Sequence, residues 1–303
     1  MTAPWFAIGT YDAGMGPRPA IVVDDTMFDL AAVQTAVGLD AGVTSVDAAL
    51  ATWETTQPIL AQIAAKTAAS GVPPVSATPL APFNPRRIFC TASNFVDHAS
   101  EMKTALAAKV DSAPYIFLKS TESVVGAEDE VVIPTHCAQI DWEVELGVVI
   151  GREGHRISVE NARDYIAGYV VFNDVSARDQ IARTDFPFKH DWFRSKSYDS
   201  FGPLGPWLVP DACIPDPMNL NLKLSVNDVS MQDGSSGEMI FDIYEQIAYL
   251  STFGKLRPGD LIATGTPAGV GKGRGIFLKP GDRMTASIEL IGAISNPLVA
   301  EGV

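Results

Sequence analysis

The sequence has few cysteines, no long apolar run and a shortage of positive charge. Its cysteines, Cys90, Cys137 and Cys213, are odd in number and widely spaced and form no CxxC pair, which favours reduced thiols. No stretch approaches the roughly 20 apolar residues that a membrane-spanning helix needs. No basic residue precedes Arg18, as a secretory signal would require. These absences predict a soluble, cytoplasmic protein with no membrane partner.

The deficit of basic residues narrows the choice of partner. Lys and Arg number 22 against 36 Asp and Glu, so the net charge is −14. Nucleic acid is therefore excluded as a general partner. An acidic protein that binds an anionic substrate must concentrate positive charge or a metal ion at its site.

Length and patterning predict an α+β, mainly β fold of 303 residues. A small N-terminal α/β domain is expected over 1–75, with strands near 5–10, 19–23 and 26–30 and helices near 31–37 and 58–69. A proline-rich connector follows, and a catalytic domain is expected over 85–303. Its expected strands are 88–91, 115–119, 131–133, 143–150, 166–173, 220–226, 261–266 and 283–288, and its expected helices are 158–165 and 239–252.

Two acids interrupt an otherwise apolar strand. Glu143 and Glu145 point to the same face of an extended chain, about 7 Å apart, while Val144 takes the opposite face. Burying unpaired carboxylates costs several kcal/mol each, so a cation is expected between them. Asp174, at the end of the run 166–173, supplies a third acid. Three carboxylates with open positions indicate Mg²⁺ or Mn²⁺; the alternative is that Glu143 or Glu145 pairs with Arg or Lys.

Other polar side chains are ambiguous on their own. His98 and Glu101 share a helical face at i, i+3, so Glu101 can orient the imidazole as a general base, although a solvated pair has the same spacing. Arg178 and Lys196 suit a carboxylate ligand, but each taken singly is typical of a surface ion pair. The glycine-rich loop after strand 261–266 does not fit a phosphate-loop template, and it predicts a tight turn or backbone N–H groups and Thr266 presented to a small anion.

Five motifs in order resemble the fumarylacetoacetate hydrolase family, in its acylpyruvate hydrolase and 2-hydroxyhepta-2,4-diene-1,7-dioate isomerase branch or among the 2,4-diketo-3-deoxy sugar acid hydrolases. The likeness covers about 85–300. The motifs are the segments 93–101, 141–146 (Asp-Trp-Glu-Val-Glu-Leu), 173–179 (Asn-Asp-Val-Ser-Ala-Arg-Asp), 196–206 and 264–271.

The resemblance implies a mixed β-roll catalytic domain in a homodimer that binds a small 2-oxo acid with Mg²⁺ or Mn²⁺. It also implies that the segment 94–110 is mobile and closes as a short helix over the substrate. The roles it implies are metal ligation by Glu143, Glu145 and Asp174, catalysis by His98, Glu101 and Lys196, and substrate binding by Arg178, Gln180, Lys119 and Thr266.

The sequence departs from the family at one pocket position. Relatives commonly carry a Gln seven residues after the metal Asp, where this chain has Ile181; Gln180 lies one residue earlier. Either the turn shifts to restore Gln180, or the contact is lost and the distal group of the substrate differs.

The function implied by these residues is metal-dependent hydrolysis of a C–C bond in a 2,4-dioxo acid through a metal-bound pyruvate enolate. The alternatives are isomerisation of a hydroxydienedioate, decarboxylation of oxaloacetate, and a non-catalytic metal-binding protein.

Overall fold

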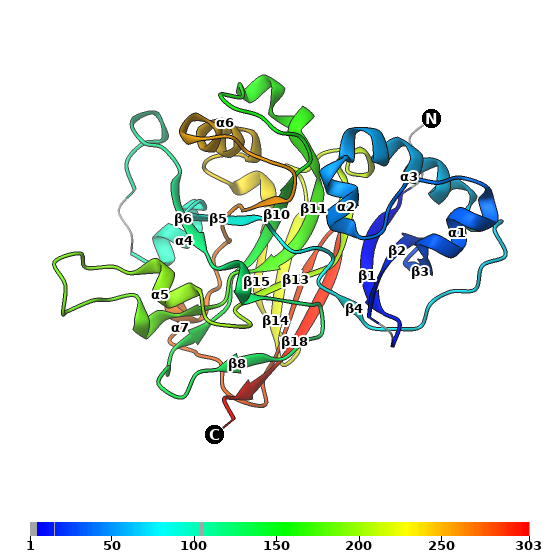
Figure 1. Cartoon of the computed structure of the whole chain (residues 1–303). Helices are drawn as coiled ribbons and strands as arrows, with labels where there is room; N and C mark the ends of the chain where they lie inside the picture. The colour runs from blue at the N-terminus through cyan, green and yellow to red at the C-terminus, as the bar shows by residue number, and fades with distance from the viewer. Residues whose placement is uncertain (1–4, 15, 104–105, 303) are drawn as a thin grey trace.

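A long sheet runs through both the N-terminal and the catalytic parts of the chain (Figure 1). The computed structural model describes residues 5–14, 16–103 and 106–302. Within them, eleven strands form this sheet along the path β3-β2-β1-β13-β11-β10-β16-β5-β6, with β4 paired to β1 and β7 paired to β13. These strands are β1 (Ala7–Asp12), β2 (Pro17–Val23), β3 (Thr26–Asp29), β4 (Pro79–Leu80), β5 (Arg87–Ala92), β6 (Tyr115–Lys119), β7 (Val124–Val125), β10 (Val144–Ile150), β11 (Ile166–Asn173), β13 (Gly202–Pro210) and β16 (Asp260–Ala263).

A second sheet and a short ribbon complete the β structure. The second sheet has the order β15-β14-β17-β18-β8, and the ribbon pairs β12 with β9. The strands are β8 (Val131–Ile133), β9 (Ile140–Asp141), β12 (Ser176–Ala177), β14 (Asn221–Val226), β15 (Val229–Ser235), β17 (Arg283–Ile288) and β18 (Gly292–Ala300).

Helices are short and lie around the sheets. The α-helices are α1 (Leu30–Val37), α2 (Val46–Ala51), α3 (Trp53–Thr67), α4 (Val96–Glu101), α5 (Trp192–Lys196), α6 (Ile243–Phe253) and α7 (Gly271–Arg274). Single-turn or short 3₁₀ segments are η1 (Lys109–Asp111), η2 (Thr121–Ser123), η3 (Val159–Tyr165), η4 (Arg178–Gln180), η5 (Asp211–Cys213) and η6 (Ser236–Glu238). None of the helices in the described residues is long and apolar enough to cross a membrane.

The predicted α+β, mainly β class is confirmed, with local differences. The segment 158–165 is a 3₁₀ segment and not an α-helix. The strand expected over 261–266 ends at Ala263, because Gly265 has a φ of +98° and turns the chain out of the sheet. Strands β13, β15 and β18 were not predicted, since glycine, proline and serine within them hide the alternation of apolar residues.

The N-terminal strands belong to the same sheet as the catalytic strands, because β1 pairs with β13 through Ile8 and Leu208. The division of the chain at 75 and 85 stays a prediction.

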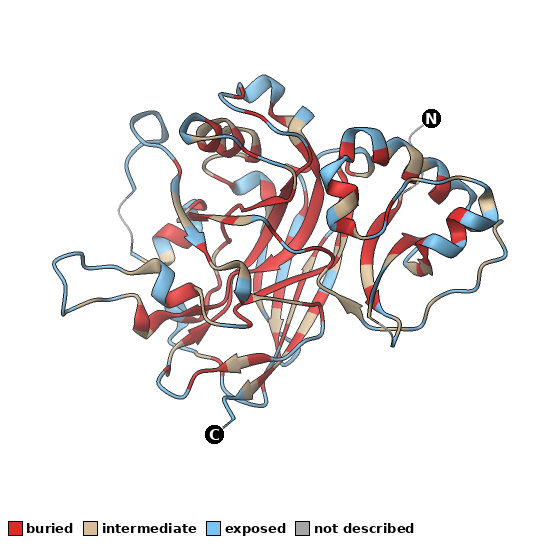
Figure 2. Cartoon of the chain, in the orientation of Figure 1, coloured by how far each residue is buried: buried red, intermediate tan, exposed pale blue. Residues whose placement is uncertain are grey.

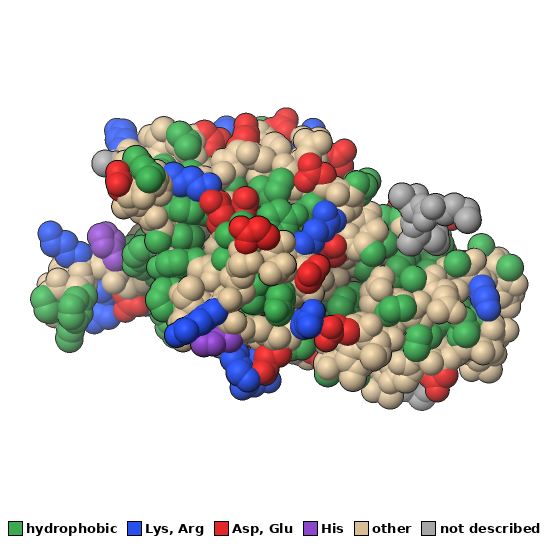
Figure 3. Space-filling model, turned by 90° about the horizontal axis from the view of Figure 1, so that it is seen from above, with side chains coloured by type: hydrophobic (Ala, Val, Ile, Leu, Met, Phe, Trp, Pro, Cys, Tyr) green, Lys and Arg blue, Asp and Glu red, His purple; other side chains and the backbone are tan. Residues whose placement is uncertain are grey.

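On the face shown in Figure 3, Lys and Arg side chains are scattered among acidic and apolar ones.

Two apolar cores cover the faces of the main sheet, and Figure 2 shows the buried strands between them. On one face, α1, α2 and α3 bury Leu30, Leu50 and Leu60 against the sheet. On the other face, the second sheet contributes Leu224 and Ile288, which share a cluster with the central strands. The central strands are thus covered on both sides, which is why β10 and β11 are buried along their whole length.

The register of β10 and β11 places the acids. The two strands are antiparallel, with Val144 opposite Asn173 and Glu145 opposite Phe172. At this end the Asp174 N–H donates to the Glu143 carbonyl at 2.9 Å, and the Glu143 N–H donates to the Asn173 side chain at 3.0 Å. Acids some 30 positions apart in the sequence therefore meet at one end of a rigid strand pair.

We expect Gly168→Ala to destabilise the protein by about 1–3 kcal/mol or more, because its new Cβ would lie 2.1 Å from the backbone oxygen of Val209 in the adjacent strand β13. Urea denaturation would measure the loss. Gly254→Ala is the matched control, because Gly254 is extended, with a φ of −178°, and a Cβ there meets no atom within 4 Å. An unchanged midpoint for Gly168→Ala would contradict the packing described for β11 and β13.

Candidate active site

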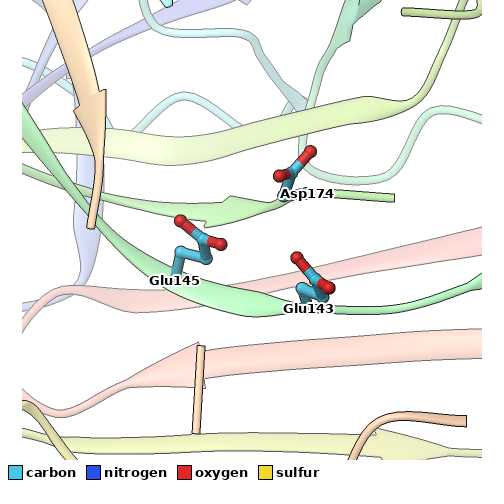
Figure 4. Close-up of side chains that lie close together, drawn as sticks. All are labelled: Glu143, Glu145 and Asp174. Carbon is cyan, nitrogen blue, oxygen red and sulfur yellow. The ribbon is translucent and has the colours of Figure 1, made fainter. Parts of the chain in front are cut away.

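Three carboxylates converge at the end of the β10–β11 pair (Figure 4). One oxygen from each of Glu143, Glu145 and Asp174 lies within 4.8 Å of the others. The residues are only 5%, 2% and 1% exposed, respectively. The predicted acidic cluster therefore exists and is buried.

Three cations surround the cluster. Arg178 donates to Asp141 at 2.7 Å and to Glu143 at 2.5 Å, and Lys196 donates to Glu143 at 2.7 Å and to Asp174 at 2.6 Å. The Lys119 ammonium lies 2.7 Å from Asp174 and 3.1 Å from the Val175 carbonyl. The interpretation of Arg178 and Lys196 as surface ion pairs is wrong, because both are at least 93% buried and both join the acids at the core of the site.

Glu143 and Glu145 experience opposite electrostatics. Burial alone would raise the pKa of Glu143, but the charges of Lys196 and Arg178 outweigh it and hold that pKa far below the usual range. Glu145 receives a hydrogen bond from the Gly265 N–H at 2.8 Å, and no Lys or Arg among the described residues forms an ion pair with it. Burial, followed by the charges of Asp174 and Glu143, raises its pKa well above the ordinary value. The open alternative, an Arg or Lys partner, thus holds for Glu143 and not for Glu145.

The site therefore has one carboxylate more than it has cations. Asp141, Glu143, Glu145 and Asp174 face Arg178, Lys196 and Lys119. An oxygen-only donor set with an uncompensated charge fits a hard divalent ion such as Mg²⁺ or Mn²⁺. Because the Lys196 ammonium bridges Glu143 and Asp174, ion binding at the three acids competes with that ammonium.

His98 and Glu101 lie on α4, and His98 lines the same cavity as the three acids. The helix follows Phe95, which is fully buried and pairs with Met239. The imidazole Nδ1 is 3.8 Å from a Glu101 oxygen and, in the described part of the chain, has no hydrogen-bond partner. Burial would raise the pKa of Glu101, but the His98 ring and the Gly269 N–H lower it below its ordinary value. The pair is thus a partly buried dyad and not a solvated surface pair.

A short helix lies in the segment 94–110 as α4, followed by η1, whereas the mobility of this segment and its closure over substrate stay predictions. Thr104 and Ala105, within the same segment, lie outside the described residues.

Backbone N–H groups of the loop after β16 hold the acids in place. Gly265 donates to Glu145, and Gly269 donates to Glu101 at 3.0 Å. Gly271 and Lys272 both donate to Asp141, at 2.6 and 2.9 Å. These N–H groups, considered in the sequence for a small anion, thus bind the protein's own carboxylates.

A cavity of about 450 Å³ opens beside the acids. Of the predicted substrate-binding residues, Arg178 and Thr266 line it. Lys119 is not among its lining residues and donates a hydrogen bond to Asp174. Gln180 is not among its lining residues: its side chain donates to the His136 carbonyl at 3.4 Å and accepts from Arg194 at 2.7 Å. Ile181 lines the cavity in its place. The turn therefore does not shift to bring Gln180 into the pocket.

Two functional positions were missed in the sequence. Asp141 anchors Arg178 and the loop, and its position at the start of the Asp-Trp-Glu-Val-Glu-Leu motif was the available signal. Gln232 is fully buried and bonds the Val144 N–H, the Thr266 hydroxyl and the Pro267 carbonyl, with no sequence signal that marks it.

Because Glu145 has no ion-pair partner among the described residues, we expect it to lower the stability of the metal-free protein while it contributes to metal binding. We expect metal-free Glu145→Gln to melt above the wild type at pH 7, by about 2–4 °C for each kcal/mol gained. At a pH below the usual pKa of a glutamate, the Glu145 carboxyl is protonated in both the folded and the unfolded protein. As pH rises, the unfolded chain releases its proton first, so the free energy of unfolding falls until the raised native pKa of Glu145 is passed.

Addition of Mn²⁺ should make the wild type melt above Glu145→Gln, because only the wild type retains all three ligands. Calorimetry in buffers of different ionisation enthalpy should show proton release on binding for the wild type and an affinity at least about 100-fold lower for Glu145→Gln. Glu289→Gln, at an exposed position, is the control. Equal melting temperatures without metal, together with equal Mn²⁺ affinity, would refute the assignment.

Comparison with known proteins agrees with the site. A family model described as fumarylacetoacetate (FAA) hydrolase C-terminal matches residues 87–299. Oxaloacetate tautomerase fahd2, mitochondrial, from Xenopus laevis is 42% identical over 223 residues, covering 73% of this chain and 68% of that protein.

Solved structures extend the likeness to nearly the whole chain. A putative HpcE protein from Mycobacterium smegmatis is 31% identical, with a TM-score of 0.79 over 97% of this chain and 100% of its own. Maleylpyruvate hydrolase from Sphingobium sp. SYK-6, solved in complex with manganese (II) ion and pyruvate, is 26% identical, with a TM-score of 0.76 over 98% of this chain and 100% of its own. With the acidic cluster, the dyad and the match over 87–299 in agreement, the chain belongs to the fumarylacetoacetate hydrolase family.

Proposed function

We propose that the protein is a hydrolase, dependent on Mg²⁺ or Mn²⁺, that cleaves the C3–C4 bond of 2,4-dioxo acids. The observation that carries the proposal is the dyad: a buried imidazole backed by Glu101 lines the same cavity as Glu143, Glu145 and Asp174. The manganese and pyruvate bound in the Sphingobium hydrolase support the same pairing of ion and product.

The acidic end of the cavity holds the 2-oxo acid head of the substrate. Glu143, Glu145 and Asp174 would hold the ion, and the charges of Lys196 and Arg178 lower the pKa of Glu143 and keep that acid ionised. A bound divalent ion supplies Lewis-acid polarisation of the 2-oxo group and offsets the charge that develops on it. Thr266 is held by the Val144 carbonyl at 2.8 Å and fixes the wall beside the head group.

His98 acts as the general base. Glu101 lies on the Nδ1 side of the ring, which leaves Nε2 to take a proton from water. The distance of 3.8 Å shortens to a hydrogen bond as α4 closes over substrate. The lowered pKa of Glu101 keeps its carboxylate ionised, so that it orients the ring and stabilises the imidazolium.

The bond changes then balance with one water molecule. Its hydroxide adds to the C4 carbonyl, and collapse of the tetrahedral adduct breaks the C3–C4 bond. The electron pair passes to the pyruvate fragment as its enolate, and C4 leaves as a carboxylic acid. Lys196, whose pKa is raised by Asp174 and Glu143 against the effect of burial, stays charged and stabilises the enolate until C3 takes up the proton that His98 removed from the water.

Keto–enol tautomerisation of oxaloacetate is the second candidate. The observation in its favour is the 42% identity to a protein named an oxaloacetate tautomerase. His98 would then move the C3 proton directly, and no water would add to the substrate. Parallel assays of acetylpyruvate cleavage and of oxaloacetate enol–keto exchange, each with and without Mn²⁺, would separate the two reactions.

We expect His98→Ala to lower kcat for acetylpyruvate cleavage by about 10²–10⁴-fold, the range typical of a lost general base. Its affinity for Mn²⁺, measured by calorimetry, should be unchanged, because His98 is not one of the three ligands. His155→Ala, at an exposed histidine, is the control. Wild-type turnover by His98→Ala would remove the dyad from the mechanism.

A further inference from the structure

A second, smaller chamber adjoins the catalytic cavity. Its volume is about 270 Å³, and it shares Ala92, Ser93, Tyr115 and Trp192 with that cavity. Its other walls include Leu106, Ile240 and Phe241. Among the described residues, its lining contains no Asp, Glu, Lys, Arg or His, in contrast to the acidic end of the catalytic cavity.

Aromatic rings join the two spaces. Phe117 stacks on Trp192 with ring centroids 5.4 Å apart, and Trp192 packs against Tyr115 at 6.2 Å. The Lys196 ammonium lies 5.3 Å from the Phe117 ring centroid. A ligand whose head lies at the acids therefore continues along an aromatic wall into the smaller chamber.

The cations near this path are already committed to acids. Arg178, Lys196 and Lys119 each bond to carboxylates of the acidic cluster. Lys109 lies 5.5 Å from the Phe241 ring, but its ammonium is bound to Glu245 at 2.7 Å. His190 borders the catalytic cavity on an exposed loop but is not among the lining residues of the chamber, and Ile181 adds an apolar side chain to the cavity wall. Within the described residues, the hydroxyls of Ser93, Ser112 and Tyr115 are the polar groups of the lining side chains apart from the Trp192 indole, so a terminal carboxylate would enter this chamber without a cation to pair with, at a cost of several kcal/mol.

We infer that the distal substituent of the substrate, beyond C4, is an uncharged aliphatic or aryl group that occupies this chamber. The inference rests on the proposed function and narrows its substrate class to 2,4-dioxo acids with an apolar acyl group. Each methylene placed in the chamber strengthens binding by about fourfold, until its volume is filled.

Calorimetric titration of the Mn²⁺-loaded protein tests this without turnover. The probes are 2-oxobutanoate, 2-oxohexanoate and 2-oxooctanoate, together with 2-oxoadipate, which has the same number of carbons as 2-oxohexanoate but ends in a carboxylate. We expect affinity to rise about fourfold per methylene, and 2-oxohexanoate to bind at least about tenfold more tightly than 2-oxoadipate.

The variant Ile240→Arg places a cation in the chamber and should therefore bind 2-oxoadipate more tightly than 2-oxohexanoate. Binding of Mn²⁺ and of the short 2-oxobutanoate should be unchanged, which shows that the variant is folded. Val229→Arg is the matched control, since Val229 is 59% exposed, lies at the turn between β14 and β15 and lines neither space.

The outcomes separate the two proposals. Tighter binding of 2-oxoadipate than of 2-oxohexanoate, or no effect of chain length, overturns the inference and leaves the proposed function standing. A protein that binds Mn²⁺ but none of these acids overturns both.

Discussion

One electrostatic imbalance governs the site: within the described residues, four carboxylates are buried there beside three cations. Arg178, Lys196 and Lys119 are bonded to Asp141, Glu143 and Asp174, and the one hydrogen bond that those residues give to Glu145 comes from the Gly265 N–H. An isolated buried carboxylate is costly, so the site favours either a proton on Glu145 or a divalent ion beside it. A divalent ion held by Glu143, Glu145 and Asp174 would offset the same imbalance.

The fold meets this constraint with rigid elements. Because β10 and β11 are covered on both faces, they cannot relax to separate their acids. The glycine-rich loop supplies backbone N–H groups to Glu145, Glu101 and Asp141, so one short segment connects the acidic cluster with the dyad. The proposed general base and the candidate ion site are thereby held in a common frame.

The cavity has two chemically distinct ends. Its head is charged and filled by ion pairs. Its far side is formed by Tyr115, Phe117 and Trp192 and leads to a chamber that, among the described residues, is lined by uncharged side chains. Under the proposed function, the chemistry on the 2-oxo acid takes place at the head. Selection among 2-oxo acids would then fall to the far side, where the side chain of Ile181 lines the cavity.

The mainly β class, the shared face of Glu143 and Glu145 and the His98–Glu101 pair could be predicted from the sequence, because alternation along a strand and i, i+3 spacing on a helix are local properties. Three features became visible with the folded chain: Arg178 and Lys196 are buried in the site, Glu145 has no ion-pair partner among the described residues, and Gln180 points away from the cavity. Those outcomes arise from contacts between segments far apart in the sequence, such as Asp141 with Gly271 or Val144 with Gln232. No local pattern encodes such contacts, since they depend on how whole sheets and loops pack together.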